Sequence, residues 1–174
     1  MRIVVSGTHS SGKSTLISDF ALARPEFVVL DDPYELIDEP DAAGAASFVK
    51  QLQLASDRLI ELSPGDSVIA ERGPLDFLAY LIALDELGRG GTGDIVRELA
   101  AVAERAMRGV DLLVLLPPAS TVDDEEDPVL RTAMADALIE LIDDVDLVGP
   151  ARVIELTGAP DQRLHQLLEQ VTPH

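Results

Sequence analysis

Hydrophobic positions follow two patterns that alternate along the whole chain. Short runs of consecutive apolar, largely β-branched residues are typical of strands in a parallel sheet. They predict strands at Arg2–Ser6, Phe27–Leu30, Ser67–Ala70, Val110–Leu116 and Arg152–Leu156. Between these runs, apolar residues recur at helical spacing. They predict helices from Lys13 to the residues before Pro25, and at Phe48–Leu62, Leu75–Leu87, Asp94–Met107, Pro128–Asp144 and Asp161–Val171.

The alternation of strands and helices predicts an α/β fold. Parallel strands need a crossover between them, and a helix usually provides it, so both faces of the sheet should be covered. Two stretches lack the pattern: Asp38–Ala46 is rich in acidic residues, Pro, Gly and Ala, and Gly88–Gly93 holds four glycines. No internal repeat or interdomain linker is visible, and 174 residues suit one core. We therefore expect one domain over residues 1–174.

The charge of the chain is strongly negative. Thirteen Lys and Arg stand against 32 Asp and Glu, a formal net charge of −19. Such a field repels phosphate backbones and anionic membranes, so neither nucleic acid nor a membrane is an expected partner. The chain has no cysteine, which excludes disulfides, thiolate zinc sites and a cysteine nucleophile. The longest apolar runs, Leu78–Leu84 and Leu112–Leu116, are too short to span a membrane.

The N-terminus is hydrophobic but leads directly into a glycine motif without a small-residue cleavage site. It therefore does not read as a signal peptide, and a cytoplasmic protein is expected.

A phosphate-binding motif follows the first predicted strand. Residues 7–15 read Gly-Thr-His-Ser-Ser-Gly-Lys-Ser-Thr and match GxxxxGK[ST] at every required position. The glycines let backbone N–H groups curl around a phosphate, and the helix N-terminus adds partial positive charge. Lys13 is one of two lysines in the chain and would bridge the β- and γ-phosphates, while the Ser14 hydroxyl would bind Mg²⁺.

This motif predicts ATP and Mg²⁺ as cofactors. The residues expected to bind the nucleotide are Gly7, Ser10, Ser11, Gly12, Lys13, Ser14 and Thr15. Thr15 points to the α-phosphate or packs locally, and His9 is expected to line the loop rather than to act in catalysis. A glycine-rich turn that binds nothing is the structural alternative.

The rest of the sequence argues against several classes of phosphate-binding protein. A switch-type GTPase needs an Asn-Lys-x-Asp guanine reader, and the chain contains no asparagine. Large motor and AAA+ ATPases usually need a longer chain and an arginine from a neighbouring subunit. An adenine or guanine kinase is the economical alternative for 174 residues.

Residues 71–80 read Glu-Arg-Gly-Pro-Leu-Asp-Phe-Leu-Ala-Tyr at the end of the third strand. This segment resembles the small P-loop kinases, which carry Asp-Arg or Glu-Arg there. It is similar to kinase-like AAA domains with the motif Asp-Arg-Gly-x-x-Asp-x-x-Ala-Tyr, including the ribosylnicotinamide-kinase type, and more distantly to deoxynucleoside and thymidylate kinases. The similarity continues through residues 111–118, Arg131 and Leu156-Thr157-Gly158.

The resemblance implies a P-loop NTPase three-layer sandwich with the strand order 2-3-1-4-5. Glu71 would then lie near the γ-phosphate and Mg²⁺, where it could accept a proton or hold a metal-bound water. Arg72 could neutralise the transferred phosphoryl group or anchor the acceptor. An ordinary surface pair of the two residues is the alternative. Asp76 either bonds the acceptor, which we favour slightly, or caps the helix that follows.

Asp31 and Asp32 end the second strand, where open α/β sheets bind ligands. In several small kinases a carboxylate at this place contacts or deprotonates the acceptor hydroxyl. Asp32 therefore competes with Glu71 as the base, and an Asp-Pro turn that merely starts a loop is an equal alternative.

The resemblance also implies a lid over ATP at about residues 117–135. Arg131 is the only basic residue between Arg108 and Arg152, so it is the lid candidate. Five acids at Asp123–Asp127 depart from the family, whose lids carry more positive charge. They would disfavour a triphosphate unless they face solvent or meet a cationic acceptor or partner.

Near the C-terminus, Gly158 lies where relatives pack the nucleobase against the backbone. Arg163 either stacks on adenine or pairs with acids on its own helix.

Two functions follow. The first is a Mg²⁺-dependent kinase that transfers phosphate from ATP to a small hydroxylated metabolite such as a nucleoside. The alternative is a nucleotide-responsive ATPase or binding module that signals to a protein partner. The aromatic residues Tyr34, Phe48, Phe77 and Tyr80 could wall the acceptor pocket or belong to the core, and Leu75–Leu87 is apolar enough to serve a homodimer.

Overall fold

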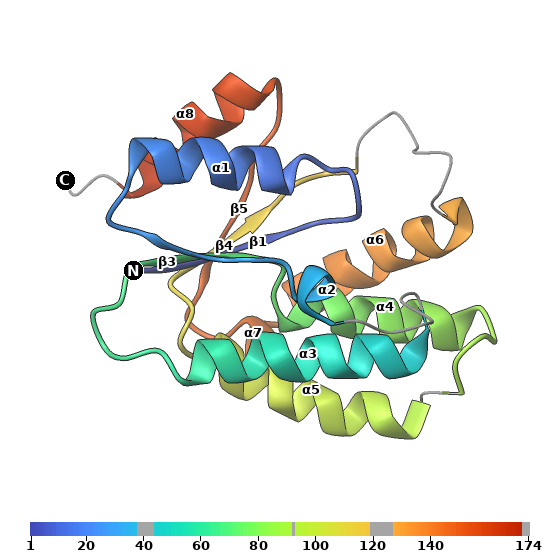
Figure 1. The fold of residues 1–174 in the computed structure, drawn as a ribbon. Coiled ribbons are helices and arrows are strands. Elements are labelled where there is room, and N and C mark those ends of the chain that lie inside the picture. The colour runs from blue at the N-terminus through green and yellow to red at the C-terminus, as the bar shows by residue number, and fades with distance from the viewer. Residues whose placement is uncertain (38–43, 92, 119–126, 172–174) are drawn as a thin grey trace.

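A five-stranded parallel sheet forms the centre of the fold (Figure 1). The structure is a computed structural model, and it describes residues 1–37, 44–91, 93–118 and 127–171. The strands are β1 (Arg2–Ser6), β2 (Val28–Leu30), β3 (Val68–Glu71), β4 (Leu112–Leu115) and β5 (Arg152–Glu155). The helices are α1 (Lys13–Ala23), α2 (Pro33–Leu36), α3 (Ala45–Ile60), α4 (Pro74–Glu86), α5 (Gly93–Met107), α6 (Pro128–Asp143), α7 (Val145–Val148) and α8 (Pro160–Val171).

The strand order is β2-β3-β1-β4-β5, so the predicted order 2-3-1-4-5 and the α/β fold class are confirmed. β1 lies in the middle and pairs with β3 on one side and β4 on the other. The β1–β3 register sets Val5 opposite Glu71. The sheet therefore brings the end of β3 beside the segment that leaves β1.

Helices cover both faces of the sheet. Figure 1 shows α1 and α8 on one face, and α3, α4, α5 and α6 on the other. Successive strand residues point to opposite faces. Ile3 and Val5 accordingly join the core under α1 and α8, whereas Val4 joins the larger core under the other helices.

Two short helices and several element ends differ from the sequence predictions. α2 and α7 were not predicted, because a four-residue helix has no periodicity to detect; each starts at an aspartate N-cap, Asp32 or Asp144. The strand predicted at Val110–Leu116 is shorter, and its apolar ends are buried outside the strand. α3 begins at Ala45 rather than Phe48.

The apolar faces of α4 are covered within the chain. The helix packs against α3, α5 and α6, and Leu75, Phe77, Leu78 and Leu81 are fully buried. The observation that suggested a homodimer is therefore explained by packing inside one chain. Within the described residues, no helix is both long and apolar enough to cross a membrane.

Candidate nucleotide-binding and phosphotransfer site

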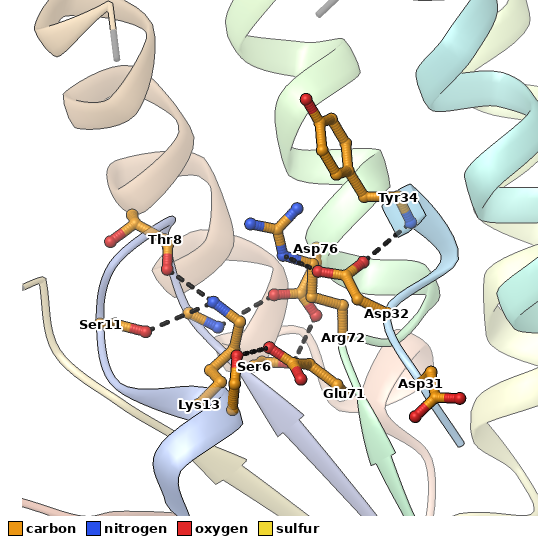
Figure 2. A network of polar contacts seen from close by, with 12 residues as sticks. Ser6, Thr8, Ser11, Lys13, Asp31, Asp32, Tyr34, Glu71, Arg72 and Asp76 are labelled. Atoms are coloured by element: carbon orange, nitrogen blue, oxygen red, sulfur yellow. Dashed lines mark hydrogen bonds and ion pairs between the residues drawn. The ribbon is translucent and has the colours of Figure 1, made fainter. Parts of the chain in front are cut away.

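The loop between β1 and α1 holds Lys13 in a buried position. The side chain is 4% exposed, and its Nζ donates a hydrogen bond to the Thr8 carbonyl oxygen at 2.7 Å (Figure 2). Burial lowers the pKa of Lys13 to about 8, and the nearby Arg72 guanidinium adds to the effect. Gly12, just before α1, has φ +92°, a conformation that suits glycine. The loop thus presents a cation that lacks full solvation and would gain from an anionic partner.

The end of β3 meets the start of α1. Ser14 Oγ donates a hydrogen bond to Glu71 Oε1 at 2.7 Å. Partial burial raises the pKa of Glu71, although the bond from Ser14 and the charge of Lys13 oppose the shift. A hydroxyl and a carboxylate, both with oxygen atoms that can bind a metal ion, therefore lie together next to the loop.

Arg72 follows Glu71 in a left-handed backbone conformation with φ +60°, which is uncommon outside glycine. Its side chain is 5% exposed, and its Nε lies 3.3 Å from Asp32 Oδ2. The guanidinium also lies over the Tyr80 ring, 5.7 Å from the centroid, and Tyr80 stacks on Phe48. Arg72 is therefore a buried residue held from two sides, and the interpretation as an ordinary surface pair with Glu71 is wrong.

Asp32 has two roles at the end of β2. One oxygen caps α2 by accepting a hydrogen bond from the Tyr34 N–H at 3.0 Å, and the other faces Arg72. The Asp-Pro turn foreseen as an alternative is present as this cap. Asp31 is exposed and lies apart from the cluster in Figure 2. Of the two acids, only Asp32 belongs to the site.

These residues share one cavity of about 420 Å³. Its lining comes from three places in the chain: the loop and start of α1, the end of β3, and the region of α2. The lining residues are His9, Ser10, Gly12, Lys13, Ser14, Thr15, Asp32, Tyr34, Glu35, Glu71 and Arg72. Sequence reasoning missed Glu35 as part of the site, because nothing in the pattern predicted α2; the Asp-Pro pair before it was the available signal.

Asp76 lies beneath the loop rather than in the cavity. It is fully buried and accepts hydrogen bonds from Ser6 Oγ at 2.6 Å, from the Gly7 N–H at 2.9 Å and from the Gly73 N–H at 2.9 Å. Burial raises the pKa of Asp76, and the three hydrogen bonds oppose that shift. The favoured assignment to the acceptor is therefore corrected: Asp76 caps α4, and it also joins the α4 end to the start of the phosphate loop.

Arg163 approaches the same loop from α8. Its Nη1 donates a hydrogen bond to the Ser11 carbonyl oxygen at 2.7 Å, and a Cβ on Gly12 would lie 3.1 Å from that nitrogen. This contact corresponds to neither of the two roles foreseen for Arg163. Gly158 precedes α8 with φ +95°, a conformation that explains the glycine; it is not among the cavity-lining residues.

Arg131, the lid candidate, lies near the start of α6. It is 5% exposed in the first turn of α6 and does not line the cavity. Most of the acidic run lies outside the described residues, but Asp127 is described. Its Oδ1 caps α6 by accepting from Val129 N–H at 2.9 Å, and its Oδ2 forms an ion pair with Arg89. Asp127 therefore has a structural role at the start of α6 and is not merely a solvent-exposed charge.

The oxygen donors fit a small divalent cation that is held partly by a ligand. Mg²⁺ typically uses one or two protein oxygens, keeps several waters and binds substrate phosphates. Ser14 and Glu71 supply such a pair. Across the described ranges there is no group of three or more His, Cys, Asp or Glu side chains that could hold a metal ion alone. A magnesium ion here would therefore depend on a bound phosphate.

The sheet order and the glycine loop together define a P-loop protein with the kinase type of fold. The family is shown by a match over residues 2–163: the chain belongs to the AAA domain family. No curated protein is similar enough in sequence to count as a match.

Several solved structures have similar folds at low sequence identity. Thymidylate kinase from Candida albicans is 18% identical with a TM-score of 0.67, and the match covers 98% of this chain and 90% of that one. Deoxyadenosine kinase from M. mycoides, with bound dATP, is 13% identical with a TM-score of 0.74, covering 98% and 99%. The NadR protein in complex with NAD and AMP-PNP is 16% identical with a TM-score of 0.67; the match covers 98% of this chain and 48% of NadR. At such identities the likeness concerns the fold.

Proposed function

We propose that the protein is a kinase that transfers the γ-phosphoryl group of ATP to a small hydroxylated molecule such as a nucleoside. The observation that carries the proposal is the 2.7 Å contact between Ser14 and Glu71, beside the buried Lys13 and Arg72. Phosphoryl transfer needs cations around the transferred group and oxygen ligands for a metal, and these four side chains supply both. The folds of the kinases described above support the same class of reaction.

The loop would hold the phosphates of ATP. Ser10, Ser11, Gly12 and Thr15 offer backbone N–H groups or hydroxyls, and Lys13 would neutralise the β- and γ-phosphates. Gly7, whose N–H donates to Asp76, would serve the turn of the loop. Mg²⁺, bound to the Ser14 hydroxyl, the Glu71 carboxylate and phosphate oxygens, would neutralise further negative charge. Gly158 is still predicted to lie beside the nucleobase of ATP, and Arg131 is still predicted to act from the lid over its phosphates.

Asp32 is the better candidate for the base of the two carboxylates. Glu71 already accepts the Ser14 hydroxyl and so faces the metal position. Asp32 stands on the α2 side of the cavity, next to Arg72. In the proposed step, the acceptor hydroxyl gives its proton to Asp32 while its oxygen bonds to the γ-phosphorus, and ADP leaves with the electrons of the broken P–O bond. Arg72 would stabilise the charge on the transferred group.

Acceptor-dependent ADP release tests the proposal. Purified protein with ATP and Mg²⁺ is offered nucleosides, nucleotides, sugars and other hydroxyl compounds, and ADP is measured by a coupled assay. We expect release that depends on one class of acceptor and is lost in Asp32→Asn. In Glu71→Gln we expect the Mg²⁺ concentration for half-maximal rate to rise. Glu98→Gln, an exposed site on α5, is the matched control.

The competing function gives a different result in the same assay. ATP hydrolysis that no acceptor changes, together with binding of ATP, would contradict the kinase and favour a nucleotide-responsive ATPase.

A further inference from the structure

The cavity contains few positive charges that an acceptor could use. The chain has 13 lysines and arginines, and the residues outside the described ranges include none of them. Only two of the 13 line the cavity, namely Lys13 and Arg72. Lys13 belongs to the ATP phosphates in the proposed function, and Arg72 is paired with Asp32 and lies over Tyr80. Among the residues that line this cavity, no further lysine or arginine is available to a second phosphorylated ligand.

Two other arginines, Arg163 and Arg58, donate hydrogen bonds to backbone carbonyl oxygens, and neither lines the cavity. Arg163 donates to the Ser11 carbonyl oxygen behind the loop. Arg58 donates to the Asp31 carbonyl oxygen at 2.7 Å, and it lines a separate, much smaller hollow between α3 and the end of β2.

The acceptor side of the cavity is instead acidic. Asp32 and Glu35 line it from the segment around α2. Asp32 is paired with Arg72, so Glu35 adds a further negative charge there, whereas Glu71 belongs to the metal position in the proposed function. Figure 2 shows Asp32 and Glu71 on opposite sides of Arg72, with Tyr34 above them. The Tyr34 side chain is exposed, lines the cavity and offers a flat surface next to Glu35.

A nucleoside monophosphate carries close to two negative charges at neutral pH and is normally held by arginines or lysines. The fold alone does not decide whether this chain takes such an acceptor, since the similar structures include one kinase named for a nucleotide and one named for a nucleoside. The charge of the residues that line the cavity does bear on which kind of acceptor the protein takes.

We propose that the phosphoryl acceptor carries no phosphate of its own and is a neutral or positively charged hydroxyl compound with a flat ring, a nucleoside rather than a nucleoside monophosphate. Glu35 is the residue that sets this preference from the acceptor side, because it adds a negative charge there and has no part in holding ATP. The inference rests on the proposed kinase function. It also accounts for why Arg72 can be committed to Asp32: without an acceptor phosphate, no arginine is needed to bind one.

Matched pairs of acceptors test this inference. The probes are adenosine, deoxyadenosine, cytidine and thymidine, each against its own 5′-monophosphate, and a pyridinium nucleoside as a cationic probe. The inference predicts that kcat/KM for the better nucleosides exceeds that of their monophosphates by about tenfold or more, since like charges repel across the cavity. Equal or higher kcat/KM for monophosphates would overturn the inference and leave the kinase standing. No acceptor-dependent ADP release with any probe would overturn the kinase itself and the inference with it.

A charge-reversal variant distinguishes the effect of Glu35 from the effect of the net charge of the protein. Glu35→Lys should reduce the ratio of nucleoside to monophosphate kcat/KM by about tenfold, and Glu35→Gln should reduce it less. Glu98→Lys changes the net charge equally on the exposed surface of α5 and should leave the ratio unchanged. A ratio that stays at the wild-type value in both Glu35 variants, or that falls equally in Glu98→Lys, would refute the role of Glu35. Melting temperatures with and without ATP verify that each variant is folded and binds nucleotide.

Discussion

Replacing Lys13 by methionine should stabilise the protein without nucleotide while abolishing the response to ATP. Lys13 is 4% exposed, and burial lowers its pKa from 10.5 to about 8. Because each pKa unit corresponds to about 1.4 kcal/mol, keeping this lysine charged in the folded state costs about 3 kcal/mol. Methionine keeps the shape of the side chain without the charge. It loses the hydrogen bond to the Thr8 carbonyl oxygen, which offsets about 1 kcal/mol.

The net gain in the free energy of unfolding is therefore about 2 kcal/mol at pH 7, or a rise in melting temperature of about 4–8 °C for a chain of this size. Its dependence on pH follows from the direction of the shift. Below about pH 8, Lys13 is charged in both the folded and the unfolded state, and the cost is fully present. As the pH rises from about 8 to 10.5, the folded protein releases the proton first, so the cost falls away. The advantage of the variant should shrink over that range.

Urea denaturation at pH 7 and pH 9.5 measures both quantities, and thermal melting with ATP and Mg²⁺ measures binding. Lys50→Met is the matched control: Lys50 is the other lysine of the chain and is exposed on α3. The wild type should melt higher with ATP, and Lys13→Met should not. A Lys13→Met protein that is less stable than the wild type at pH 7, or whose advantage is the same at both pH values, would refute the reasoning from burial.

Substitutions at three further positions test how the loop and α6 are held. Asp76→Asn places an amide N–H₂ where three donors now find acceptors, so we expect a loss of about 3 kcal/mol in urea denaturation; an unchanged midpoint would contradict the buried network. Arg163→Gln removes the bond to the Ser11 carbonyl oxygen and should raise KM for ATP by about tenfold with a smaller change in kcat, whereas a loss confined to kcat would argue against positioning. Asp127→Ala should cost about 1 kcal/mol of stability, and Asp127→Asn clearly less, because asparagine keeps the cap of α6; equal losses would assign the effect to the Arg89 ion pair instead.

The sequence predicted those features that depend on short stretches of chain. The phosphate loop is a contiguous motif, and the apolar runs of the strands are local patterns, so both could be located before the structure. Strand order was predicted only through family resemblance. The position of Glu71 follows from that order, because a parallel register places the ends of neighbouring strands together.

What the sequence did not predict depends on contacts between distant residues. Asp76 has the right spacing for a helix cap, and its second role depends on Ser6 and Gly7, about 70 residues earlier. Arg163 bonds Ser11 across 152 positions of sequence, and no local pattern indicates which of several acceptors an arginine will choose. Arg131 was predicted as the lid arginine from the family resemblance, because it is the only basic residue between Arg108 and Arg152, and this role stays a prediction. Its burial in α6 depends on packing that composition does not show.

The contacts of Asp76 and Arg163 have a consequence for how the loop binds phosphate. Asp76 fixes the Gly7 N–H from the α4 side, and Arg163 holds the Ser11 carbonyl oxygen from the α8 side. Both contacts are made by side chains of the protein itself, and this restraint on the loop lowers the conformational entropy that is lost on binding. The same preorganised loop keeps the Lys13 charge away from water. A phosphate that neutralises this charge relieves the cost of its burial, and that relief adds to the affinity for ATP.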